Sequence, residues 1–246
     1  MKNIICLYKK KGETPLACVE RFKDLNKEYL DVPLTYAGRL DPMAEGLLLV
    51  LAGDERYKKE KYLNLNKVYE VEILLGIETD TYDVLGIPIM QEKKIMRNEV
   101  SDMLKRYVRT INQPYPPFSS KTVKGKPLFM WARQNKLDTI DIPGKRVTIH
   151  SIDVLNTRSI STNDVREKIL KDVMSVKGDF RQDEIQEVWN SLPSRKDLFV
   201  IKIKVHCSSG TYMRSLAHNL GKDLGVGAIA LSIVRAKIGN YTLRDI

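Results

Sequence analysis

The chain has 246 residues, of which 43% are hydrophobic and 29% charged, so it can form one large domain with its own core and is not a wholly disordered protein. Lysine and arginine total 41 against 31 aspartate and glutamate, and the resulting net charge of +10 favours nucleic acid as a partner. The alternative is that the excess lysine serves only solubility.

The N-terminal half predicts short strands separated by helices. Strand composition or alternation marks residues 3–8, 46–53 and 67–76. A helix is predicted over 14–26, with Thr14 as its N-cap and Pro15 in its first turn. An amphipathic helix is predicted over 97–108, and the prolines of 111–127 predict an extended loop.

The C-terminal half contains the clearest strands, 146–157 and 198–209. Helices are predicted over 128–135 and 210–225, and a final strand pair follows. Residues 161–197 predict one or two charged helices inserted between the two strands. Because alternation indicates half-exposed, largely antiparallel strands, we expect an α+β fold with a mixed, mostly antiparallel central sheet flanked by helices.

The remaining composition argues against secretion and metal binding. Three cysteines form no CxxC pair, and three histidines show no metal-binding spacing, so neither a disulfide framework nor a metal site is expected. No apolar run approaches the ~20 residues that span a bilayer, and the N-terminus does not resemble a secretory signal. We therefore expect a cytoplasmic protein without membrane association.

Asp41 is the first candidate for chemistry. It stands in the turn "GRLDP", two residues after Arg39 and just before the aliphatic run Leu47–Leu51. An Asp before Pro is a common turn residue, which is the structural interpretation. The functional interpretation is that Arg39 lowers the pKa of Asp41 and the aliphatic run excludes water, leaving a carboxylate able to act as nucleophile or base.

Other candidates are individually weaker. Tyr69 lies in an alternating strand, where a core aromatic is the ordinary role. Arg214 lies near the start of a predicted helix, as a surface residue or as a phosphate contact. Lys121 and Lys124 share the proline-rich loop with aromatic residues, a pattern that suits either a solvated loop or a surface that grips a nucleic-acid backbone.

Four strings in order carry a family resemblance: "GRLDPMAEGLLLV", "KVYEVEILLGIETDTYDVLG", "PPFSSKTVKGKPLFMWAR" and "HCSSGTYMRSLAHNLGKDLGVGA". Together they resemble the TruB-type pseudouridine synthases over residues 3–157 and 198–243. The resemblance implies one pseudouridine synthase catalytic domain over 1–246, acting without metal or organic cofactor. It also implies isomerisation of uridine in RNA, with the T-loop uridine of tRNA (position 55) as the expected substrate.

The resemblance also assigns roles by position. Asp41 matches the catalytic aspartate of the family's G-x-L-D-P motif, and Tyr69 the tyrosine of K-x-Y, which stacks on the target base and is thought to assist proton removal. Arg214 matches the arginine of G-T-Y-x-R, which pairs with the catalytic carboxylate, and Asp83 matches an acidic position of T-D-T-x-D near the active site. Whether the Asp41 carboxylate attacks C1′ or C6 of the uridine, or abstracts a ribose proton, stays open.

The chain departs from the family in several places. Tyr36 stands where the family has a histidine that packs against the flipped-out loop, and Arg39 stands where a small residue is usual. "GRLD" is closer to the spelling in ribosomal-RNA pseudouridine synthases. The helical segment 161–197 looks like an insertion, and no C-terminal PUA domain is evident. We expect the insertion either to be a tolerated surface feature or to compensate in part for that domain.

These departures leave two alternative functions open. One is a pseudouridine synthase that acts on ribosomal or other RNA, and the other is a non-catalytic RNA-binding protein on the same fold. Tyr36, Arg39, Asp83, Lys121 and Lys124 are the expected substrate-binding residues, and a monomer is the expected state.

Overall fold

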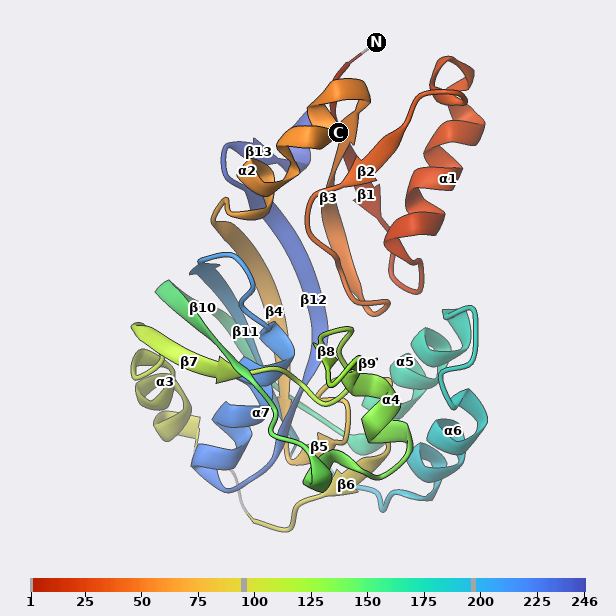
Figure 1. Ribbon diagram of the computed structural model, residues 1–246. Helices are drawn as coiled ribbons and strands as arrows, with labels where there is room; N and C mark the ends of the chain where they lie inside the picture. The colour runs from red at the N-terminus through yellow and green to blue at the C-terminus, as the bar shows by residue number, and fades with distance from the viewer. Residues whose placement is uncertain (1, 94–96, 196–197) are drawn as a thin grey trace.

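A nine-stranded sheet organises the chain in the computed structural model, which describes residues 2–93, 97–195 and 198–246 (Figure 1). In sheet order, its seven main strands are β1 (Ile4–Lys9), β3 (Ala44–Ala52), β12 (Ala228–Ile238), β4 (Lys67–Leu75), β11 (Leu198–Cys207), β10 (Gly144–Ile160) and β7 (Thr110–Pro114). Neighbouring strands are antiparallel except for the parallel pair β3–β12. The expected α+β class with a mostly antiparallel sheet is confirmed.

Short strands extend this sheet or form separate hairpins. Strand β2 (Leu34–Tyr36) pairs with β3, and β13 (Tyr241–Thr242) pairs with β12. Strands β5 (Ile77–Thr79) and β6 (Pro88–Met90) form one hairpin, and β8 (Thr122–Val123) and β9 (Lys126–Pro127) form another. β12 joins the two ends of the molecule, since it pairs with β3 and β13 at one end and contacts β5 at the other (Figure 1).

The helices are α1 (Pro15–Leu25), α2 (Lys59–Leu63), α3 (Arg97–Lys105), α4 (Leu128–Arg133), α5 (Thr162–Ser175), α6 (Gln182–Ser191) and α7 (Met213–Leu224). The expected cap of α1 is confirmed, because Thr14 Oγ1 accepts a hydrogen bond from the backbone N–H of Ala17 at 3.1 Å. The expectation of one or two helices in 161–197 is confirmed with two, α5 and α6, while 196–197 lie outside the described residues. No helix in the described ranges is long and apolar enough to cross a bilayer.

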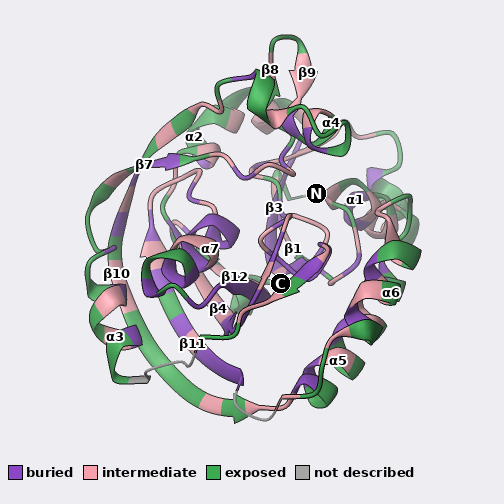
Figure 2. Ribbon diagram, turned by 90° about the horizontal axis from the view of Figure 1, so that it is seen from below, coloured by how far each residue is buried: buried purple, intermediate pink, exposed green. Residues whose placement is uncertain are grey.

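Both faces of the sheet carry apolar side chains. Helices α3 and α7 cover one face, where alternate residues such as Ile73 of β4 and Ile203 of β11 join the largest core cluster. Helices α5 and α6 cover part of the other face, where Leu74 and Val200 meet Trp189. The outward faces of α5 and α6 are exposed (Figure 2). The alternation that predicted half-exposed strands therefore holds only where no helix lies on the second face.

The expectation of an extended loop over 111–127 is wrong in part. Residues Thr110–Pro114 form β7, whose register pairs them with Gly144–Thr148 of β10. Pro114 is tolerated because it ends an edge strand, where its missing N–H breaks no ladder between central strands. The β8–β9 hairpin turns at Lys124 and Gly125, which both have left-handed backbone angles.

Candidate active site

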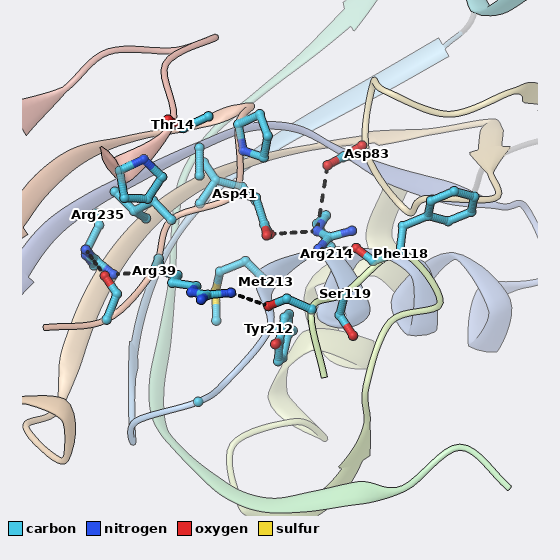
Figure 3. Close-up of a pocket in the computed structure, with 18 of the residues that line it drawn as sticks. Thr14, Arg39, Asp41, Asp83, Phe118, Ser119, Tyr212, Met213, Arg214 and Arg235 are labelled. Atoms are coloured by element: carbon cyan, nitrogen blue, oxygen red, sulfur yellow. Dashed lines mark hydrogen bonds and ion pairs between the residues drawn. The ribbon is translucent and has the colours of Figure 1, made fainter. Parts of the chain in front are cut away.

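Asp41 and Arg214 form an ion pair although they lie 173 positions apart in the sequence. Asp41 lies in the loop between β2 and β3, and Arg214 is the second residue of α7. Arg214 Nε donates to Asp41 Oδ2 at 2.8 Å and lies 3.7 Å from Asp83 Oδ2, in the loop between β5 and β6 (Figure 3). The Arg214 side chain is 3% exposed, whereas that of Asp41 is 36% exposed. One carboxylate thus stands open beside a buried cation.

The guanidinium of Arg214 is held from several directions. Its Nη1 donates to the carbonyl of Thr81 at 2.9 Å, and its Nη2 donates to the carbonyl of Phe118 at 3.2 Å. Burial works against the positive charge, but Asp41 and Asp83 outweigh it, and the pKa of Arg214 is raised. Because the guanidinium is planar and fixed by three chain segments, it also fixes the orientation of Asp41.

Asp83 is a second, buried carboxylate in the same site. Its Oδ1 accepts hydrogen bonds from Thr81 Oγ1 at 2.8 Å and from the N–H of Leu85 at 3.0 Å. Burial raises the pKa of Asp83, and the charge of Arg214 opposes that rise. These hydrogen bonds fix Asp83 within the loop between β5 and β6, next to the guanidinium of Arg214.

A cleft of about 760 Å³ contains Asp41, Tyr69, Asp83 and Arg214. Its apolar lining includes Leu40, Ala44, Leu63, Leu85, Met213 and Ile233. The expectation that Leu47–Leu51 form this wall is wrong. Their side chains point alternately into two other clusters, one under α1 and one against Tyr62, because both faces of β3 are covered.

Tyr69 projects from β4 opposite Arg235 of β12. Burial raises the pKa of the Tyr69 phenol, and the neighbouring guanidinium of Arg235 opposes the rise. Tyr69 is therefore protonated at neutral pH, and it offers the cleft an aromatic face and a hydroxyl donor.

The other expected residues lie around or beyond the cleft. Arg39 lines it, but Arg39 Nη1 donates to Ser120 Oγ at 2.9 Å, so Asp41 pairs with Arg214, as the family resemblance implies, and not with the neighbouring Arg39. Tyr36 also lines the cleft, with Lys59 Nζ 5.7 Å from its ring centre. Lys121 and Lys124 are exposed at the β8–β9 hairpin, outside the lining.

Two buried cations that the sequence reasoning missed hold the backbone around Asp41. Arg235 donates from Nε to the carbonyl of Leu47 at 2.8 Å, and from Nη2 and Nη1 to those of Gly38 at 3.2 Å and Arg39 at 3.3 Å. Lys9 Nζ donates to the carbonyls of Pro42 at 3.2 Å and Ala44 at 2.5 Å.

Burial lowers the pKa of Lys9 to about 8. The available signal in the sequence was a charge inside an apolar strand pattern, at Lys9 in "IICLYK" and at Arg235 in "ALSIVRAKI".

No group of three or more His, Cys, Asp or Glu side chains is placed to hold a metal ion within the part of the chain that the structure describes. The polar groups of the cleft are instead arranged as ion pairs and backbone hydrogen bonds. Their chemistry suits proton transfer or nucleophilic attack by Asp41.

Comparison with known proteins relates the chain to one family. Residues 32–178 match the family model described as TruB family pseudouridylate synthase (N terminal domain). Proteins named tRNA pseudouridine synthase B are similar along the whole chain. The Clostridium tetani protein is 27% identical, covering 100% of this chain and 70% of that protein, and the Thermotoga maritima protein is 28% identical, covering 99% and 65%.

A solved structure titled as a Cbf5–Nop10–Gar1 complex shares the fold. It is 18% identical, with a TM-score of 0.60 over 97% of this chain and 49% of that chain. This chain thus spans about half of the solved protein and 65% to 70% of the two curated relatives.

Proposed function

The chain belongs to the TruB family of pseudouridylate synthases, and from this premise we propose that it isomerises uridine to pseudouridine in RNA, at the T-loop uridine of tRNA. The observation that carries the proposal is the ion pair between Asp41 and the buried Arg214, in a cleft shared with Tyr69. The names of the relatives support tRNA as the substrate class. We propose residues 1–246 as one catalytic domain, which acts as a monomer in the cytoplasm.

The reaction breaks the C1′–N1 bond of uridine and forms a C1′–C5 bond, while C5 loses a proton and N1 gains one. The base must first leave its stack in the RNA loop, and the face of Tyr69 can replace that stacking in the cleft. Asp41 is the group placed to attack or to accept a proton, with Arg214 balancing its charge. The apolar lining keeps water from the detached base while it turns.

Tyr36 and Arg39 of the cleft lining and Lys121 and Lys124 of the β8–β9 hairpin are proposed to contact the RNA. Tyr36 offers a ring for stacking, and Arg39, Lys121 and Lys124 offer exposed cations for phosphates. A non-catalytic RNA-binding protein is the weaker candidate, because binding alone requires no carboxylate held against a buried arginine.

Tritium release tests the choice of reaction and substrate. Transcripts of a tRNA and of ribosomal RNA fragments, each labelled with 5-tritiated uridine, are incubated with the protein, and pseudouridine is then located by chemical mapping. We expect release from tRNA with product at the T-loop uridine. Pseudouridine in ribosomal RNA alone would show that ribosomal RNA is the substrate. RNA binding without tritium release from any RNA would show that the protein is a non-catalytic RNA-binding protein.

A further inference from the structure

The segment between α5 and α6 reaches the active-site cleft. The two helices pack on the second face of the sheet through a buried stripe that includes Val165, Ile169 and Trp189. The link between them brings Asp179, Phe180 and Arg181 into the cleft lining. Part of the segment expected to be an insertion therefore forms a wall of the catalytic site.

Arg181 contacts two loops of the site from this link. Its Nη2 lies 2.8 Å from Asp80 Oδ2, and its guanidinium carbon lies 4.6 Å from the ring centre of Phe118. The Arg181 side chain is 23% exposed. Arg181 also has a left-handed backbone with φ of 62°, which costs a non-glycine residue about 1 kcal/mol.

The two residues that Arg181 contacts belong to the two loops that hold Arg214. Asp80 directly precedes Thr81, whose carbonyl accepts from Arg214 Nη1, and the carbonyl of Phe118 itself accepts from Arg214 Nη2. Asp80 Oδ1 also accepts from the N–H of Ile87 at 2.9 Å, which closes the turn that contains Asp83. A continuous set of contacts thus runs from the α5–α6 link to the guanidinium that orients Asp41.

We propose that Arg181 is a positioning residue for the isomerisation: by contacting Asp80 and Phe118 it fixes the two carbonyls that hold Arg214, and so fixes Asp41. This inference rests on the proposed function. A positioning role predicts a slower chemical step. If Arg181 instead bound an RNA phosphate, its removal would weaken RNA affinity and leave the rate of the chemical step unchanged.

Three variants and a matched control separate these roles. Arg181→Asn removes the guanidinium and keeps a residue that tolerates a left-handed backbone. Arg181→Lys keeps the charge but not the planar contact with Phe118, and Asp80→Asn removes the partner charge. Lys171→Ala, at an exposed position of α5, removes a cation from the same segment away from the cleft.

Single-turnover rate and RNA dissociation constant are measured for each protein with labelled tRNA. We expect Arg181→Asn to lower the rate by roughly five- to twentyfold, with a change in dissociation constant below about twofold, and Arg181→Lys to lie between it and the wild type. Lys171→Ala should keep the wild-type rate. The Arg181→Asn/Asp80→Asn protein should be no slower than the slower single variant, because both changes break one contact.

Amide hydrogen exchange supplies a readout that does not depend on activity. In Arg181→Asn, exchange should accelerate over 79–87, including the N–H of Ile87, and stay unchanged in α5 and β4. If the wild type isomerises no RNA, the proposed function fails while exchange still decides whether Arg181 holds these loops. Unchanged exchange with an unchanged rate, or a weakened RNA affinity with an unchanged rate, would overturn the positioning role.

Discussion

Cations approach Asp41 from three sides. Arg214 binds its carboxylate, while Lys9 and Arg235 bind backbone carbonyls after and before it. Lys9 and Arg235 are fully or almost fully buried, and a buried charge is costly unless it is hydrogen-bonded. The carbonyls therefore stabilise the two cations, and the cations in turn fix the loop that carries these carbonyls. The position of Asp41 is therefore set by electrostatics on both its side chain and its backbone.

Arg214→Gln should damage both catalysis and folding. The variant leaves Asp83 buried without its neighbouring charge, so we expect a loss of about 3 kcal/mol in the free energy of unfolding. The single-turnover rate should fall by about a hundredfold or more, because Asp41 loses its orienting partner. Urea denaturation and tritium release measure the two effects.

The double variant Arg214→Gln/Asp83→Asn is the control for this prediction. Neutralising Asp83 should restore part of the stability and none of the activity. A normal rate in the single variant would show that Arg214 does not orient the reacting group.

Lys9 should make stability depend on pH in the alkaline range. Burial lowers its pKa to about 8 in the folded protein, against about 10.5 in the unfolded chain, and the charges of Glu13, Asp41 and Glu45 nearby oppose that lowering. Between these values only the unfolded chain keeps the proton, so the free energy of unfolding rises with pH relative to a protein without this lysine.

Urea denaturation of the wild type and Lys9→Met at pH 7.5 and pH 10.5 tests the sign. From pH 7.5 to pH 10.5, the free energy of unfolding of the wild type should rise relative to that of Lys9→Met by up to about 3 kcal/mol. A constant difference across this range would mean that Lys9 is not desolvated in the folded state.

Among the elements, α5 and α6 are part of the core. Their apolar stripe covers Leu74, Val200 and Ile229, which lie on three adjacent strands of the sheet. Lys11 of the N-terminal segment also pairs with Asp172 of α5 at 2.9 Å. Whether the segment is an insertion relative to the family stays a prediction, but its removal would expose an apolar sheet face.

Trp189→Ala measures this packing. Trp189 is fully buried on α6, so we expect the variant to lose about 3–5 kcal/mol in the free energy of unfolding. The exposed Met174 on α5 provides the control, since Met174→Ala should change stability by less than about 0.5 kcal/mol. A Trp189 variant as stable as this control would indicate that α6 is only loosely attached.

Regular strands and helices could be predicted because periodicity and caps are local properties of the sequence. Strand β7 was missed because it pairs with residues of β10 that lie 30 to 38 positions later, and because Pro114 and the prolines after it obscured the pattern. The same limit affected the site: from the residues alone only the neighbouring Arg39 was available as a partner of Asp41, and Arg214 was expected there only through the family resemblance. The tertiary fold brings Arg214 there instead, and it aims the charges of Lys9 and Arg235 inward.

At the scale of the whole molecule, the net charge of +10 predicts RNA binding that weakens with salt. Arg39, Arg133 and Lys145 are exposed or half-exposed cations in the cleft lining, and Lys121 and Lys124 are exposed on the β8–β9 hairpin. If these contact about five phosphates, the logarithm of the association constant should fall against the logarithm of salt with a slope of about −3 to −5.

A binding titration of tRNA from 50 to 300 mM KCl measures this slope. The variant Lys121→Gln/Lys124→Gln should bind less tightly and reduce the slope by about 1 to 2. A slope near zero would indicate that affinity comes from the cleft alone.

The most direct test of the account is the single-turnover conversion of tritiated T-arm RNA by the Asp41→Asn protein. Asparagine keeps the size of the side chain but cannot attack or accept a proton as a carboxylate does. We predict no detectable pseudouridine from Asp41→Asn, with RNA affinity within about threefold of the wild type, which converts the RNA fully. Pseudouridine formation by Asp41→Asn at the wild-type rate would contradict the assignment of Asp41 as the reacting group.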